Sequence, residues 1–176
     1  MGKKLVTLMA IFVMIVGGAI LEPTITQAAA EEKGIPVIVQ SFAPKELAPG
    51  DVWKVYLKAT DPDGKMKYIL ATISQPGVGS YPVSITKIKG ENQKELSGYI
   101  YLKTDSVQSS RLFNLTLTLT VNIKDDKGQF SKSSVFPLSF VAKPSPEAPP
   151  EGAFSEQDLG PIMVTLRTVE GGGRRR

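Results

Sequence analysis

Residues 115–123 alternate strictly between apolar and polar side chains, and this run constrains the fold more than any other part of the chain. A period of two places successive side chains on opposite faces of a β-strand, one face in a core and one in water. An acidic turn at 124–128 and a second strand-like run at 129–141 follow. The pattern therefore predicts a long β-hairpin within an all-β domain. The apolar positions are Leu115, Leu117, Leu119, Val121 and Ile123.

The first thirty residues have the order of a secretory signal peptide. Lys3 and Lys4 precede an apolar run at 5–21, and residues 28–30 are alanines, the small side chains that signal peptidases select. We expect export from a bacterial cell to the periplasm or the extracellular space, with cleavage after Ala30. An uncleaved membrane anchor is the alternative, because the apolar run approaches the roughly 17–25 residues that span a bilayer.

The composition excludes several kinds of chemistry. The chain has no cysteine and no histidine, so it cannot build a cysteine nucleophile, a Ser-His-Asp triad, or a zinc or haem site that depends on those ligands. Its net charge is only +4, and its lysines are scattered along the strand-like segments. A nucleic-acid-binding protein would cluster them. We therefore expect a protein that is not an enzyme and does not bind nucleic acid.

Seven strand-like segments separated by turn signals follow the predicted signal peptide. They are rich in Val, Ile, Thr, Tyr and Phe, and strands at a spacing of about 8–12 residues are typical of a β-sandwich. Pro137 favours an edge position for the last strand, because proline donates no ladder hydrogen bond. We predict one antiparallel β-sandwich over 34–142. The segments are 37–42, 52–60, 67–73, 83–89, 96–103, 112–124 and 129–141.

Two turn-centred motifs lie near the two ends of this predicted sandwich. One begins at Leu47-Ala48-Pro49-Gly50-Asp51 and ends at Asp61-Pro62-Asp63-Gly64; the other runs from Leu117 to Gly128. Together they resemble bacterial immunoglobulin-like domains, particularly the polycystic-kidney-disease-type and cadherin-like branches. The Trp-Asp-Phe-Gly-Asp-Gly signature of the first branch is absent, and residues 68–75 stand in its place. The resemblance implies a seven-stranded immunoglobulin-like sandwich with a non-catalytic adhesion, spacer or carbohydrate-associated role.

An immunoglobulin-like strand order brings two acidic turns to the same end of the sandwich. Asp61 and Asp63 would then lie near Asp125 and Asp126. Calcium binds six to eight oxygen atoms, several of them from carboxylates, so these residues are a candidate calcium site and calcium is the one candidate cofactor. The alternative is that each aspartate stabilises only its own turn while interleaved lysines neutralise the charge.

Aromatic residues on the strands have two different predicted roles. Trp53 shares a strand face with Val55, which assigns it to the core. Tyr56 has the opposite parity, and Tyr99 and Tyr101 share a face of their own strand. Because tyrosine rings bury a large area at low entropy cost, these three are candidate contacts for an envelope protein or polysaccharide. Cross-strand packing that covers the sheet is the alternative.

The chain after the predicted sandwich divides into a proline-rich linker at 143–152 and a C-terminal peptide with a basic tail at 153–176. The peptide is apolar enough to need a partner. It can fold back as an extra strand, insert into another protein by β-augmentation, or remain a flexible tail. Arg167 and the terminal arginines suit an anionic surface. The candidate partner-binding residues are Ile162, Val164, Leu166 and Arg167.

These observations together predict an exported, non-catalytic binding or structural module of the cell envelope or extracellular space. Two alternatives stay open. One is an accessory subunit whose segment 154–169 inserts into a partner protein, and the other is a calcium-stabilised adhesion domain. In each case, we expect the signal sequence to be the only membrane-associated part.

Overall fold

The computed structural model describes residues 34–104 and 112–167, so the predicted signal peptide and the basic tail lie outside the described residues. The described chain contains ten strands, one short 3-10 helix and no α-helix, and no helix in it is long and apolar enough to cross a membrane. The elements are β1 (Val37–Phe42), β2 (Glu46–Leu47), β3 (Val52–Thr60), β4 (Met66–Gln75), β5 (Gly79–Ser80), β6 (Ser84–Lys87), η1 (Gly90–Asn92), β7 (Glu95–Lys103), β8 (Thr116–Asp125), β9 (Ser134–Phe140) and β10 (Asp158–Pro161).

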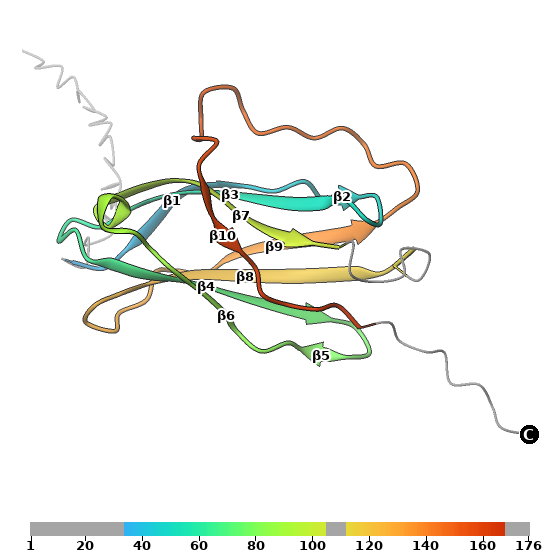
Figure 1. The fold of residues 1–176 in the computed structure, drawn as a ribbon, viewed down its shortest axis with the longest axis horizontal. Helices are drawn as coiled ribbons and strands as arrows, with labels where there is room; N and C mark the ends of the chain where they lie inside the picture. Colours follow the sequence, from blue (N-terminus) through green and yellow to red (C-terminus); the bar gives the residue numbers. More distant parts are fainter. Residues whose placement is uncertain (1–33, 105–111, 168–176) are drawn as a thin grey trace, which may run out of the picture. The chain divides into compact units, whose positions relative to one another are not determined.

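The strands form two sheets that enclose one core (Figure 1). The first has the order β1-β3-β7-β10. The second has the order β2-β9-β8-β4-β5, with β6 also paired to β4. Each predicted segment contains a strand, and the bounds of β1 and β3 are those predicted. Proline lacks a backbone N–H donor, and Pro137 is not one of the two β9 residues, Ser139 and Phe140, that pair with β2. The ladder between β2 and β9 therefore loses no hydrogen bond at Pro137.

The prediction of seven strands in a wholly antiparallel sandwich needs correction. The structure adds β2, β5 and β10, and both sheets are mixed, because β2 pairs with β9 and β10 pairs with β7 in parallel. These three strands have two, two and four residues. Such short segments show no alternation of their own, since their pairing depends on neighbouring strands that sequence periodicity does not detect.

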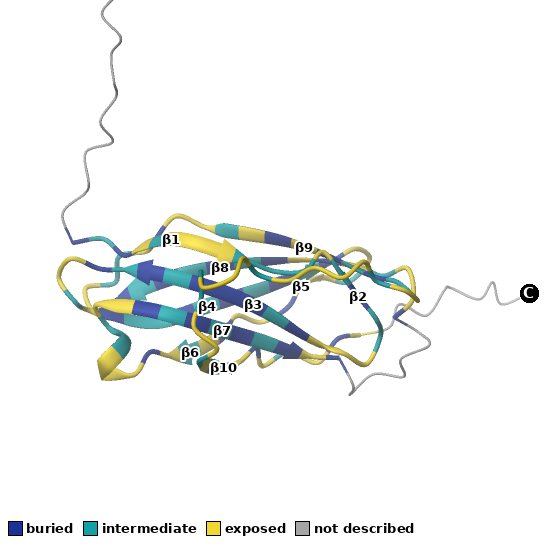
Figure 2. Ribbon diagram, turned by 90° about the horizontal axis from the view of Figure 1, so that it is seen from above, coloured by how far each residue is buried: buried dark blue, intermediate teal, exposed yellow. Residues whose placement is uncertain are grey.

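The inner faces of both sheets are apolar, as the alternating patterns predict. Figure 2 shows buried and less buried positions following one another along β3 and β8. Trp53 is fully buried, as predicted, and its indole Nε1 donates a hydrogen bond to the carbonyl of Pro44 at 2.9 Å. Of the run that begins at Leu115, the residues from Leu117 to Ile123 are core at every second position, whereas Leu115 is half-buried before β8 begins.

The C-terminal segment folds back onto the sandwich. We call residues 153–167 the strap. The linker leaves β9, and β10 of the strap then pairs with the edge of β7 and lies in front of the strands in Figure 1. Ile162 and Leu166 are each only 4% exposed and belong to the same apolar cluster as the inner faces of the two sheets. Of the three alternatives for this segment, the structure therefore shows the extra strand at a sheet edge.

Candidate functional site

The two acidic turns each contain one buried aspartate that stabilises its own loop. Asp61 accepts hydrogen bonds from the amides of Asp63 at 2.9 Å and Lys65 at 3.1 Å. Asp125 accepts the amide of Gln129 at 2.7 Å and the side-chain amide of the same residue at 2.9 Å. Both carboxylates are nearly inaccessible to solvent. Their oxygens therefore serve the backbone of the turns.

The turns meet at one end of the sandwich, where the amide of Asp126 donates to the carbonyl of Lys65 at 3.1 Å. The more exposed carboxylates at this end form ion pairs with lysines. Lys127 lies 2.7 Å from Asp63, and Lys65 lies 3.8 Å from Asp126. The hydrogen bond with Asp63 is the main cause of a raised pKa at Lys127. Within the described ranges, no three acidic side chains gather closely enough to hold a metal ion.

We expect added calcium to leave the melting temperature unchanged. The buried carboxylates are occupied by amide donors, and the exposed ones lie beside lysines that a divalent cation would have to displace. Calorimetric titration with Ca²⁺ and melting curves in chelator test this expectation. Binding heat together with a higher melting temperature in Ca²⁺ would instead establish the predicted calcium site.

The tyrosines lie on the outer face of the four-stranded sheet, where Tyr56 pairs in register with Tyr99. Tyr56 is 6% exposed, because its ring lies 5.6 Å from the ring of Phe154 in the strap as well as 5.6 Å from that of Tyr99. Tyr99 and Tyr101 are half-buried, with ring centroids 6.3 Å apart. The Nζ of Lys54 lies 4.2 Å from the Tyr99 ring centroid. The accessible surface, which we call the tyrosine patch, comprises Tyr99, Tyr101 and Lys54.

One carboxylate of the strap holds the strap to this face. Glu156 accepts hydrogen bonds from Nζ of Lys54 at 3.0 Å and from the hydroxyl of Tyr56 at 2.9 Å. Hydrogen bonding from Lys54, and then from Tyr56, holds the pKa of Glu156 below its usual 4.5. The same bond with Glu156 raises the pKa of Lys54, whereas burial is the main cause of a raised pKa at Tyr56.

We expect the contribution of Glu156 to stability to disappear in acid. A lowered pKa in the folded state means that the stabilisation is complete above about pH 4.5 and is lost as the pH falls through the lowered value. The free energies of unfolding of the wild type and of E156Q should therefore differ at about pH 6, and the difference should be smaller at about pH 3. E151Q, a change at an exposed linker carboxylate, is the matched control. A difference between wild type and E156Q that is the same at both pH values would contradict the assignment.

Backbone groups of the strap bind both sheets. The amide of Tyr99 donates to the carbonyl of Gln157 at 2.9 Å, and the amide of Ile162 donates to the carbonyl of Tyr101 at 2.7 Å. On the other sheet, the amide of Met163 donates to the hydroxyl of Ser84 at 2.8 Å. The strap therefore connects the edges of the two sheets on one side of the sandwich.

The end of the strap is held by two buried side chains. The amide of Arg167 donates to the hydroxyl of Tyr81 at 2.7 Å, and its carbonyl accepts from Nε2 of Gln75 at 2.7 Å. The Tyr81 hydroxyl in turn donates to Oε1 of Gln75. The sequence does not predict this arrangement. Gln75 precedes Pro76 and Gly77, and such a Pro-Gly sequence predicts a solvent-exposed turn.

The predicted partner contacts of the strap have different positions in the structure. Ile162 and Leu166 lie in the core of their own domain, and Val164 packs against it, half-buried. The exposed Arg167 is anchored through its backbone. Gly98 leaves one inner-face position of its strand without a side chain, at the place where the strap approaches β7. A Cβ atom at Gly98 would lie 2.5 Å from the carbonyl oxygen of Gln157.

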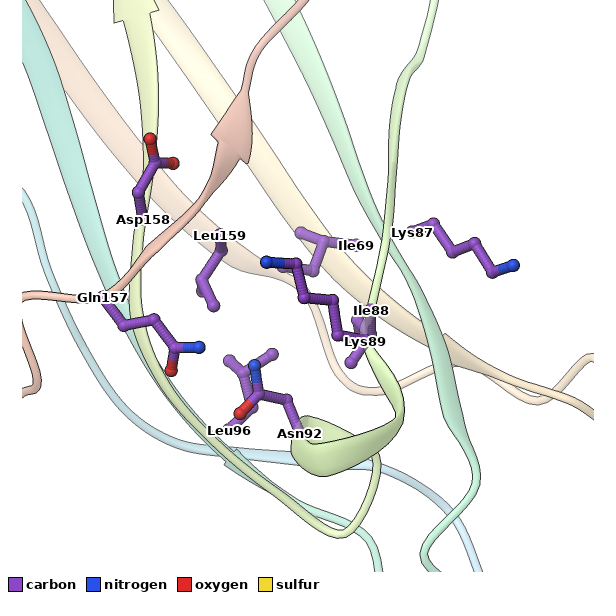
Figure 3. A pocket seen from close by; sticks show the side chains of 9 residues that line it. All are labelled: Ile69, Lys87, Ile88, Lys89, Asn92, Leu96, Gln157, Asp158 and Leu159. Carbon is purple, nitrogen blue, oxygen red and sulfur yellow. The ribbon is translucent and has the colours of Figure 1, made fainter.

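A small cavity lies where the start of the strap meets β7 and the turn that contains η1 (Figure 3). Leu159 from the strap, Leu96 from β7 and Ile69 from β4 line it together with the 87–89 segment. Its volume is about 10 Å³, which is roughly the room that one water molecule needs. Pockets for small molecules measure about 300–1,000 Å³, so this cavity is far too small for a substrate.

Comparison with known proteins gives little guidance. No protein-family model matches the chain, and no curated protein sequence matches it. Among solved structures, the chain has a distant likeness to the PKD domain of an M14-like peptidase from Thermoplasmatales archaeon SCGC AB-540-F20. The identity is 14%, the TM-score is 0.34, and the match covers 60% of this chain and 92% of that domain. A TM-score this low supports no inference, so the description of the fold depends on the strand pairing alone.

Proposed function

We propose that this protein is a non-catalytic immunoglobulin-like module that works by binding, in the cell envelope or outside the cell. The strand order supports the fold assignment. In immunoglobulin sandwiches, strands A, B and E share one sheet while C, F and G share the other. By chain order and pairing, β1, β3 and β7 correspond to the first group, and β4, β8 and β9 to the second. Export is supported by the sequence of residues 1–30.

The observation that carries the proposed function is the tyrosine patch on the outer face of the four-stranded sheet. Tyr99 and Tyr101 remain partly accessible beside the cation of Lys54. Aromatic rings next to charged groups are enriched in recognition surfaces, because they combine buried area with directional polar contacts. By contrast, the buried aspartates are occupied by their own turns. The protein therefore offers a surface for contact, with an envelope polysaccharide or an envelope protein as its partner.

The experiment is binding of the full chain to two separate probes, isolated envelope polysaccharide and detergent-solubilised envelope protein. We expect Y99A/Y101A to weaken binding to one of the probes about tenfold or more, as loss of an aromatic anchor typically does. T118A/T120A alters solvent-facing positions of β8 on the other sheet and should leave binding unchanged. Equal effects of the two double substitutions, or binding to neither probe, would refute the role of the patch.

The accessory-subunit alternative has one supporting observation, since the strap already adds a strand to a sheet edge. In this structure that edge belongs to its own chain. Ile162 and Leu166 would have to leave the core before they could enter another protein.

A further inference from the structure

We propose that the side of the sandwich covered by the strap is an acceptor site for the strap of a second copy of this chain, so that two copies exchange straps. The acceptor site is defined by the edge of β7 that β10 occupies together with five residues. They are Gln75, Tyr81, Ser84, Ser97 and Gly98. This inference does not depend on ligand binding at the tyrosine patch, although Lys54 of that patch also contacts the strap.

The acceptor site recognises an extended backbone through side chains. The hydroxyl of Ser97 accepts the amide of Ser155 at 2.9 Å, and Ser84, Gln75 and Tyr81 bind backbone groups of 163 and 167 at 2.7–2.8 Å. None of these hydrogen bonds requires the strap to be covalently continuous with β9. A strap from another copy can make all of them.

The acceptor site is also selective for this particular segment. Ile162 and Leu166 enter the core, and the absent side chain of Gly98 leaves the room that Gln157 and Leu159 occupy. Glu156 of the strap meets the cation of Lys54. A vacated site exposes apolar core to water, which is unfavourable in proportion to the apolar area exposed. The vacated acceptor site therefore favours binding of any segment with the same apolar and charged residues as the strap. The strap of a second copy has all of these residues.

Detachment of the strap uncovers the core around Ile162 and Leu166 but leaves the long strand ladders paired. Its strand pairs with β7 at three positions only, with a shift of register between Asp158 and Gly160. The linker before it is held by two solvent-exposed bonds, from the amide of Lys45 to Glu147 and from the amide of Ser145 to Glu46. The long ladders of β3 with β7 and of β4 with β8 do not involve it. Opening of this kind is a local event that costs less than global unfolding.

The linker determines which copy fills the site. The ten-residue tether keeps the chain's own strap at a high effective concentration next to the site, so dilute protein is closed on itself and exchange grows as the protein concentration rises. Exchange of identical elements between copies is a known route to dimers. We therefore expect a concentration-dependent dimer whose two sandwiches each contain the strap of the other copy.

The test mixes two full-length variants. G98V blocks the acceptor site and leaves the strap intact, because a side chain there would clash with Gln157 and Leu159. I162S/L166S leaves the acceptor site unchanged but removes the two apolar side chains with which the strap enters the core. We expect each variant alone to stay monomeric and the mixture to give a 1:1 heterodimer in native mass spectrometry, with a melting temperature above that of either variant. A mixture that stays monomeric and gains no stability would overturn the proposal.

A second measurement uses a full chain whose core residues are unchanged. A protease recognition sequence is placed in the linker at 146–151 of the full chain and cut after folding. We expect labelled peptide 153–167 to replace the cut strap faster than the protein unfolds globally, and the I162S/L166S peptide to fail. If the cut strap exchanges only upon global unfolding, or falls away and the peptide does not bind, strap exchange is refuted.

Discussion

Replacing Leu166 with alanine should lower the free energy of unfolding by about 2–5 kcal/mol, the usual cost of removing a buried leucine side chain. Leu166 is 4% exposed and packs in the same cluster as the inner faces of the sheets. The expected loss is large because the surroundings of a buried leucine relax only partly into the vacated volume. Urea unfolding measures the change, and the effect of I162A should be of similar size.

The control lies in the same strap. Met163 stands next to Ile162 but is 75% exposed, so M163A should change stability by no more than about 0.5 kcal/mol. If L166A and M163A behave alike, the strap contributes no core and the description of a completed sandwich is wrong. A large effect of L166A with none of M163A shows that burial, and not helical or strand propensity, causes the loss.

Replacing Asp61 with alanine should cost about 2–4 kcal/mol, because two amides lose a charged acceptor in a nearly dry turn. The exposed fraction of Asp61 is only 1%, so water reaches the vacated position poorly. D61N, which retains one carbonyl oxygen, should be intermediate. Thermal and urea unfolding of both variants measure the effect.

Asp126 supplies the matched control for Asp61. Its side chain is 44% exposed and lies 3.8 Å from Lys65, an arrangement in which an ion pair contributes about 0–1 kcal/mol. D126A should therefore be close to the wild type. A loss at D126A as large as that at D61A would mean that the acidic end acts as one coupled cluster, as the calcium hypothesis requires.

The sequence predicted the parts of the fold that depend on local alternation. In a long alternating run such as that of β8, the apolar positions identify the side chains on the inner face. Trp53 was assigned to the core in the same way, because it shares a strand face with Val55. Turn chemistry at Asp61 and Asp125 was likewise readable, because both residues bind amides only two to four positions away. Local signals therefore sufficed wherever the partner atoms are close in sequence.

The sequence offered an extra strand as one of three alternatives for the C-terminal segment, but the contacts of the strap were beyond prediction because its partners are far away in the chain. Gln75 and Tyr81 meet Arg167 across 92 and 86 positions, and four residues of β10 show no alternation. A glycine inside a strand is typical of a bulge or of close approach by another segment, and at Gly98 the structure shows close approach. For the same reason Tyr56 read as an accessible aromatic residue, although Phe154 covers it.

Native-state hydrogen exchange at the amide of Ile162 tests most directly whether the strap completes the sandwich. We expect exchange slowed about a hundredfold or more relative to an unstructured peptide, because this amide is bonded to the carbonyl of Tyr101 at 2.7 Å beside a buried side chain. The protection should remain below that of Leu119 in β8, since the strap opens before the ladders do. Exchange of Ile162 at the rate of a free peptide, with Leu119 still protected, would contradict the claim that the strap completes the sandwich.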